Sequence, residues 1–112
     1  MVEQSLEAWA GASWCDGLQL DSCQDLEQIL VRTANTVYQL IVLHGRAGEV
    51  LIRGGRFFPD FRRVRFAGAT AGGNVIKLLG LYRGLRIEVD DGRERVITSP
   101  VQSIARKPAS QS

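Results

Sequence analysis

The stretch of sequence that decides the fold reads Val37-Tyr38-Gln39-Leu40-Ile41-Val42-Leu43-His44, followed by Gly45-Arg46-Ala47-Gly48 and Glu49-Val50-Leu51-Ile52-Arg53. Its first part is rich in branched residues and apolar on both faces, which predicts a central β-strand over residues 37–43. The short loop with two glycines then suits a hairpin, and residues 49–53 supply the returning strand. We therefore expect an antiparallel sheet around this hairpin.

Shorter segments with strand patterns lie on both sides of the hairpin. Residues 85–90 alternate between apolar and charged side chains, which predicts a strand with one buried face and one wet face that carries Glu88. Asp91-Gly92 follows this strand and is a strong hairpin turn signal. In residues 63–66 arginine alternates with an apolar residue, which is the pattern of another strand. The other predicted strands cover residues 29–34, 75–82, 96–98 and 101–104.

Together these segments predict a mainly β fold, namely a small SH3-like or similar half-open β-barrel. About six to eight short strands separated by glycine turns fit into roughly 75 residues, which favours a meander over a sandwich. A split βαβ fold is the main competitor, but no segment after residue 30 has good helical periodicity.

Two connections between the predicted strands carry special residues. Phe57-Phe58-Pro59-Asp60 is expected to form an irregular turn, because proline cannot join a central ladder. Residues 67–74, Ala-Gly-Ala-Thr-Ala-Gly-Gly-Asn, predict a tight or flexible turn that requires positive φ at glycine. A backbone cradle for phosphate is the other interpretation of this loop, but the loop lacks the Lys-Ser/Thr pair of a P-loop.

The charges divide the chain into two parts. Residues 1–31 contain six acidic residues and no Lys or Arg, whereas residues 32–112 contain all 14 basic residues. Apolar residues at helical spacing predict a short amphipathic helix over residues 2–14. We therefore expect an acidic helical or loop arm (1–27), a β-barrel domain (28–105) and a flexible tail (106–112). The arm either lies across the basic barrel, caps one end of it, or exchanges between two copies of the chain.

Composition places the chain among soluble single-domain proteins. Its 112 residues suffice for one core, and 45% apolar with 23% charged residues is ordinary globular usage. No apolar run approaches the roughly 18 residues that span a bilayer. No signal peptide is visible, so we expect a cytoplasmic protein without membrane contact.

Two cysteines and one histidine do not make a structural zinc site by themselves, and we expect no metal and no cofactor.

Three strings resemble small bacterial proteins of an uncharacterised family. They are Thr33-Ala34-Asn35-Thr36-Val37-Tyr38, Gly54-Gly55-Arg56-Phe57-Phe58-Pro59 and Thr98-Ser99-Pro100-Val101-Gln102-Ser103-Ile104. The likeness covers residues 31–104 and excludes the acidic arm and the tail. It implies a small bacterial protein without an assigned activity, and it transfers no catalytic residue.

The candidate binding site is a segment in which arginine is interleaved with phenylalanine. Arginine presents planar charged groups that suit phosphates, and exposed aromatic faces can stack on bases. In the plain interpretation the phenylalanines are core and loop anchors, and the arginines form a solvated face that nearby carboxylates neutralise. The candidate ligand-binding residues are Arg53, Arg56, Phe57, Phe61, Arg62, Arg63 and Arg65.

Catalytic patterns are weaker than this binding pattern. Cys15 or Cys23 with His44 would form a nucleophile–base pair, but nothing in the sequence places them together. Asp90 and Asp91 are adjacent on a strand end and point apart, and the turn explains the second of them.

We therefore interpret the chain as a non-catalytic binding or assembly module of unknown partner, with another protein, self-association and nucleic acid as the candidates. Its ligand is not named by any motif. The leading alternative is a nucleic-acid-binding barrel that uses the arginine cluster, and an enzyme is the third interpretation.

Overall fold

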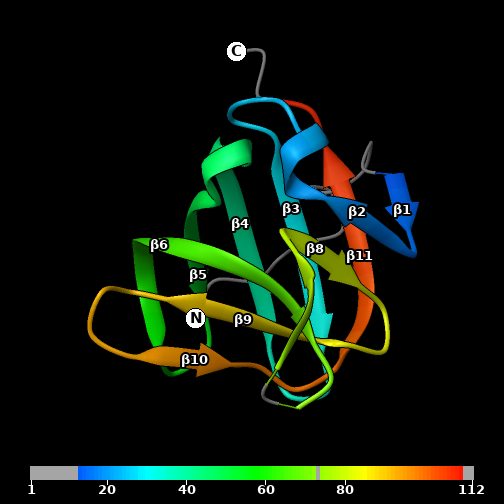
Figure 1. Cartoon of the computed structure of the whole chain (residues 1–112). Helices are drawn as coiled ribbons and strands as arrows, with labels where there is room; N and C mark the ends of the chain where they lie inside the picture. The colour runs from blue at the N-terminus through cyan, green and yellow to red at the C-terminus, as the bar shows by residue number, and fades with distance from the viewer. Residues whose placement is uncertain (1–12, 73, 110–112) are drawn as a thin grey trace.

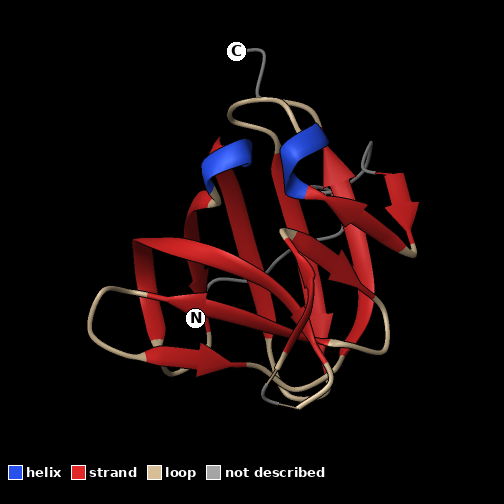
Figure 2. Cartoon of the chain, viewed as in Figure 1, coloured by secondary structure: helices blue, strands red, loops and turns tan. Residues whose placement is uncertain are grey.

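The computed structural model describes residues 13–72 and 74–109 of the chain. These residues form eleven strands and two short 3₁₀ turns, and strands make up most of the ribbon (Figure 1, Figure 2). In chain order the elements are β1 (Ser13–Cys15), β2 (Gly17–Gln19), η1 (Leu20–Ser22), β3 (Gln28–Thr33), β4 (Val37–His44), η2 (Gly45–Ala47), β5 (Glu49–Gly54), β6 (Phe58–Thr70), β7 (Val75–Leu78), β8 (Gly80–Tyr82), β9 (Arg86–Asp90), β10 (Arg95–Ile97) and β11 (Val101–Lys107).

Two antiparallel sheets contain the described strands. The larger sheet has nine strands in the order β1-β11-β3-β4-β5-β6-β9-β10, with β7 also paired to β6. The smaller sheet consists of β2 and β8. The hydrogen-bonded path of the larger sheet runs from β1 to β10 without returning to its start. The prediction of a mainly β fold is confirmed, whereas the sheets do not close into a barrel.

The predicted N-terminal helix finds no support in the described residues. Its last two residues, Ser13 and Trp14, belong to β1, which pairs with β11, and residues 1–12 lie outside the described residues. A strand forms here because β1 supplies hydrogen-bond partners to the backbone groups on the outer edge of β11. At the other end, β11 continues to Lys107, two residues into the segment predicted as a tail.

The long strand β6 connects the two halves of the larger sheet. Its first part pairs with β5 from Phe58 to Arg65, and its second part pairs with β9 from Arg65 to Thr70. The register shifts beside Gly68, which has a φ of 147°. A Cβ at this position would collide with the backbone carbonyl oxygen of Lys77. Glycine therefore allows β7 to approach β6 at the bulge.

The predicted connections on both sides of β6 are shorter than expected. Pro59 lies inside β6 rather than in a turn, and a register shift opposite Gly54 leaves the proline outside regular pairing. Residues 67–70 continue the strand, so the connection to β7 begins only at residue 71. Glycine and proline content indicated loops in both segments. Pairing with β5 on either side of Pro59, and pairing with β7 and β9 at residues 68–70, hold the backbone extended instead.

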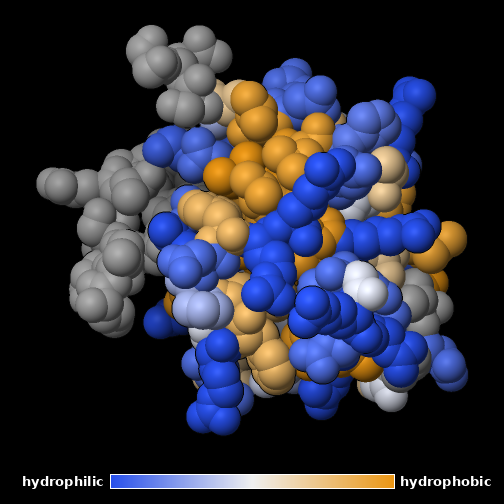
Figure 3. Space-filling model, turned by 90° about the vertical axis from the view of Figure 1, so that its left-hand side faces the viewer, coloured by the Kyte–Doolittle hydropathy of each residue, from blue (hydrophilic) through white to orange (hydrophobic). Residues whose placement is uncertain are grey.

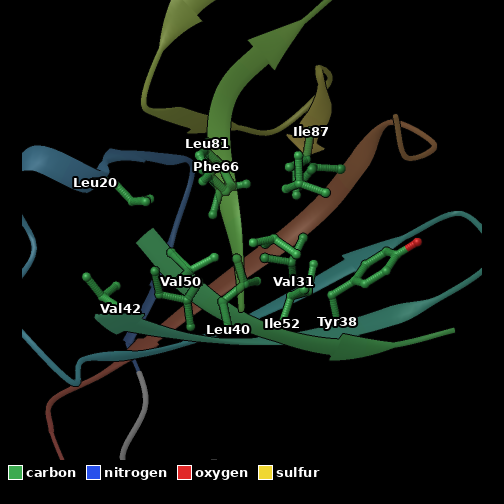
Figure 4. Packing of buried hydrophobic residues seen from close by; sticks show 14 of the residues in the cluster. Leu20, Val31, Tyr38, Leu40, Val42, Val50, Ile52, Phe66, Leu81 and Ile87 are labelled. Atoms are coloured by element: carbon green, nitrogen blue, oxygen red, sulfur yellow. The ribbon is translucent and has the colours of Figure 1, made fainter. Parts of the chain in front are cut away.

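The core lies between the two layers that the bend of β6 creates. Phe66 and Leu81 point toward Leu40 and Ile52 from the opposite side, and all four are 0% exposed (Figure 4). Full burial of one such side chain contributes about 1.5–3 kcal/mol. Ile41, which faces the other side of β4, is only half-buried. The strand predicted to be apolar on both faces therefore buries one face completely and the other in part.

Replacing Gly68 with alanine tests the close approach of β7 to β6. Gly68 and Gly72 share nearly the same φ, 147° and 155°, but a Cβ at Gly72 would meet nothing within 4 Å. We expect Gly72→Ala to lower the free energy of unfolding by about 1 kcal/mol, through backbone strain alone. Gly68→Ala adds a backbone collision and should lower it by about 3 kcal/mol or more. Denaturant unfolding measures both, and equal losses would contradict this account.

Candidate binding surface

The structure distributes the seven candidate residues over three places. On β6, Val64 and Phe66 are buried while Arg63 and Arg65 are exposed, as the alternation predicts. The outer face of β5 and β6 carries four of them, namely Arg53, Phe61, Arg63 and Arg65. The turn between these strands carries Arg56 and Phe57. Arg62 lies on the side of β6 that also holds Val64. We call Arg53, Arg56, Phe57, Phe61, Arg63 and Arg65 the Arg–Phe surface.

Arg53 and Phe61 form a fixed pair on this surface. The guanidinium carbon of Arg53 lies 4.5 Å from the centre of the Phe61 ring. The same guanidinium donates a hydrogen bond of 2.7 Å from Nη2 to Oε1 of Gln39. A cation–π contact of this kind contributes about 0.5–1 kcal/mol at an exposed site. The two contacts hold the guanidinium against the ring, so its charge has a defined position.

Two arginines of the segment are paired with carboxylates of neighbouring strands. Arg63 Nη2 lies 2.7 Å from Glu49 Oε1, and Arg62 Nη1 lies 3.0 Å from Asp91 Oδ2. The backbone N–H groups of Glu94 and Arg93, together with Arg62, lower the pKa of Asp91 below its ordinary value. Both arginines stay more than half exposed, so the pairs add little stability. Their main effect is to neutralise part of the positive charge.

The turn between β5 and β6 presents the remaining pair, Arg56 and Phe57. Phe57 is 55% exposed, whereas Phe58, the next residue, is 1% exposed and anchors the start of β6. Arg56 is exposed and forms no ion pair with any described residue. A cation and an aromatic ring are therefore neighbours at the tip of the β5–β6 hairpin.

The described carboxylates of the acidic arm do not cover the Arg–Phe surface. Asp16 Oδ1 lies 2.8 Å from Arg83 Nη1, and Glu27 Oε2 lies 2.6 Å from Arg106 Nε. The hydrogen bond that Arg106 donates to Glu27 raises the pKa of Arg106. Of the other four arm carboxylates, Asp21 accepts a hydrogen bond from Gln19, Asp25 forms no ion pair with a described residue, and Glu3 and Glu7 lie outside the described residues.

Two hollows lie beside the Arg–Phe surface. The first, of about 500 Å³, has charged walls that include Glu49, Arg63 and Arg65. The second, of about 410 Å³, lies between η2, β6, β7 and β9 and has apolar walls that include Leu78 and Leu79. Figure 3 views the side of the molecule that carries β6 and the β9–β10 turn, and it shows an apolar area between hydrophilic side chains.

The second hollow contains a residue that sequence reasoning placed wrongly. Glu88 was expected on a wet face, but it is only 7% exposed. It pairs with Gly68 of β6, and Gly68 pairs with Leu78 of β7 on the other edge of β6. No pattern in residues 85–90 carries the burial of Glu88, because it depends on strands from other parts of the chain.

The cysteine–histidine hypothesis gains no geometric support. Nδ1 of His44 accepts the backbone N–H of Ala47 at 3.2 Å, and no hydrogen bond joins it to either thiol among the described residues. Burial, followed by the charge of Glu27, raises the pKa of Cys23 to about 11. A thiol with this pKa is a poor nucleophile at neutral pH. The described part of the chain also contains no cluster of ligands for a metal ion.

Comparisons with known proteins do not assign the chain to a family. No family model, no curated protein and no solved structure matches it. The resemblance to uncharacterised bacterial proteins therefore stays a prediction. Within the described residues, no helix has the length and apolarity needed to cross a bilayer.

The raised pKa of Cys23 predicts slow alkylation. In a Cys15→Ser variant, we expect iodoacetamide at pH 8 to modify the folded chain about a hundredfold more slowly than the chain unfolded in urea, because the thiolate is rarer by that factor. The rate in the folded chain should rise with pH until about 11. Mass spectrometry follows the reaction, and equal rates in the folded and unfolded chains would contradict the buried thiol.

The two arm carboxylates that form ion pairs predict different effects on stability. Glu27 is 7% exposed, and Glu27→Gln weakens its charged hydrogen bond to Arg106, so we expect the free energy of unfolding to fall by about 1–3 kcal/mol. Asp16→Asn is the matched control, because this pair is exposed on both sides and should change stability little. Urea unfolding compares them, and a loss of the same size in both variants would refute the distinction.

Proposed function

We propose that the protein is a non-catalytic binding module whose ligand, a partner polypeptide, contacts the Arg–Phe surface. The observation that supports this most is the β5–β6 turn, where Arg56 and the 55% exposed ring of Phe57 stand next to the buried anchor Phe58. Aromatic residues and arginine are enriched at the cores of protein interfaces. The buried ring of Phe58 fixes one end of the turn, so the neighbouring ring of Phe57 projects from an anchored position.

The charges of the surface favour a partner of mixed chemistry. Glu49 and Asp91 already neutralise Arg63 and Arg62, so a uniform polyanion would have to compete with these carboxylates. A polypeptide can offer carboxylates to Arg56 and apolar groups to Phe57 at the same time. The partner that fits best is therefore acidic and apolar in alternation.

Single-stranded nucleic acid is the second candidate ligand. The exposed rings of Phe57 and Phe61 next to arginine are the observation that favours it, because bases stack on such rings while phosphates pair with the guanidinium groups. Its affinity would fall steeply with added salt. The SH3-like fold, the bacterial origin and the cytoplasmic location stay predictions from the sequence.

Fluorescence anisotropy with two labelled probes tests the proposed function. The probes are a peptide of alternating Glu and Phe residues and a single-stranded oligonucleotide of thymidines, each at about 50 mM salt. We expect the peptide to bind, and Phe57→Ser to weaken its binding about tenfold, which is the typical loss for an interface anchor.

Arg93→Gln is the matched control for this experiment, because Arg93 is an exposed arginine on the β9–β10 turn outside the Arg–Phe surface. It should leave the affinity unchanged. Binding of the oligonucleotide alone, with a steep loss in added salt, would replace the polypeptide with nucleic acid as the ligand. A lack of binding by both probes would overturn the proposal.

A further inference from the structure

The cavity between η2, β6, β7 and β9 has the size and the apolar lining of a small-molecule site. Its volume is about 410 Å³, within the range of about 300–1,000 Å³ that such sites occupy. Ala67 and Leu79 contribute apolar wall, and Leu78 stands at the rim with 74% of its surface exposed. A small organic molecule can therefore bury an aliphatic group here.

Charged residues of both signs line the same cavity. They are Arg46, Arg65, Glu88 and Asp90. Glu88 is 7% exposed and the other three are exposed, so the deep charge is a carboxylate and the guanidinium groups lie at the rim. Neither Arg46 nor Arg65 forms an ion pair with another described residue.

The deep carboxylate is satisfied on one oxygen only in part and on the other not at all. Among the described residues, Oε1 of Glu88 is the one buried side-chain polar atom without a hydrogen-bond partner. Its other oxygen, Oε2, forms an ion pair with Nη1 of Arg95 at 3.7 Å, which is longer than a hydrogen bond. A buried acceptor without a donor destabilises a fold. Such a group calls for a water, an ion or a ligand that supplies the donor.

We propose that this cavity binds a small zwitterion with an apolar body, which is the chemistry of an aliphatic α-amino acid. The ammonium group of the ligand donates hydrogen bonds to the carboxylate of Glu88, whose side chain turns to bring the buried Oε1 atom to the cavity. The carboxylate of the ligand faces Arg46 and Arg65 at the rim. Its aliphatic chain covers Leu78 and Leu79. The two arginines thereby gain the anion that they lack, and Glu88 gains a donor.

This site is separate from the turn that carries Arg56 and Phe57, so the two proposals can fail independently. The cavity takes a small molecule, whereas the Arg–Phe surface takes a polypeptide. Arg65 belongs to both, and it is therefore left unchanged in the experiments below.

Calorimetry and NMR titration with L-leucine as the probe test the cavity. 4-Methylpentanoate lacks the ammonium group and 3-methylbutylamine lacks the carboxylate. We expect L-leucine to bind at least about tenfold more tightly than either, because each removed group forfeits a charged hydrogen bond. The amide signals of Leu78, Leu79 and Ala67 should shift. Equal binding of 4-methylpentanoate, no binding of L-leucine, or shifts confined to other residues would overturn the proposal.

Glu88→Gln should weaken L-leucine binding about tenfold, since a neutral amide pairs less strongly with an ammonium group. Glu94→Gln is the matched control, because Glu94 is exposed on the β9–β10 turn, and it should leave the affinity unchanged. Leu78→Ser provides a second variant at an exposed position, where unfolding is no concern, and it should also weaken binding. Unchanged affinity in Glu88→Gln would refute the role of the carboxylate.

The stability of the ligand-free protein separates a binding role of Glu88 from a structural one. A carboxylate whose role is to bind a ligand lacks a hydrogen-bond donor in the ligand-free protein. Glu88→Gln should therefore leave the melting temperature of the ligand-free protein unchanged or raise it. Glu88→Met should do the same, because it replaces the charge with an apolar group of similar length. A marked fall of the melting temperature in both variants would show that the carboxylate stabilises the fold, and would overturn the proposal.

Discussion

The arrangement of the whole molecule depends on the bend of β6. One strand pairs with β5 over its first part and with β9 and β7 over its second part, so it turns a single sheet into two facing layers. The bend is possible because Gly68 adopts a φ of 147° and offers no Cβ to the carbonyl oxygen of Lys77. Phe66, two residues before this glycine, is thereby directed into the core opposite Leu40.

The division between acidic and basic sequence becomes a set of local ion pairs in three dimensions. Asp16 and Glu27 pair with Arg83 and Arg106, which come from later in the chain but lie outside the Arg–Phe surface. Arg62 and Arg63 of β6 instead pair with the carboxylates of Asp91 and Glu49 on the β9 and β5 sides. Charge totals along a chain therefore say little about which charges meet, because antiparallel pairing brings distant segments together.

The sequence predicts strands well where several local signals favour the same structure. Residues 37–53 fold as the expected hairpin because branched residues, a glycine loop and alternation all favour it. Prediction from the sequence fails where tertiary pairing overrides local preference. Pro59 and residues 67–70 are examples, because they lie inside β6 and not in turns. The Arg–Phe surface was visible in the sequence because its members are close along the chain. The burial of Glu88 was not visible there, because it depends on strands from elsewhere in the chain.

The close approach that completes the core also creates the charged cavity. β7 and β9 both meet Gly68, so Leu78 and Glu88 lie on either side of one residue without a side chain. In a straight β6 the alternation of β9 would leave Glu88 on a solvated face, where water would satisfy both of its oxygens. The bend thus buries the apolar core and, in the same step, one carboxylate. The packing of the core and the proposed binding cavity therefore have a common origin in the backbone of β6.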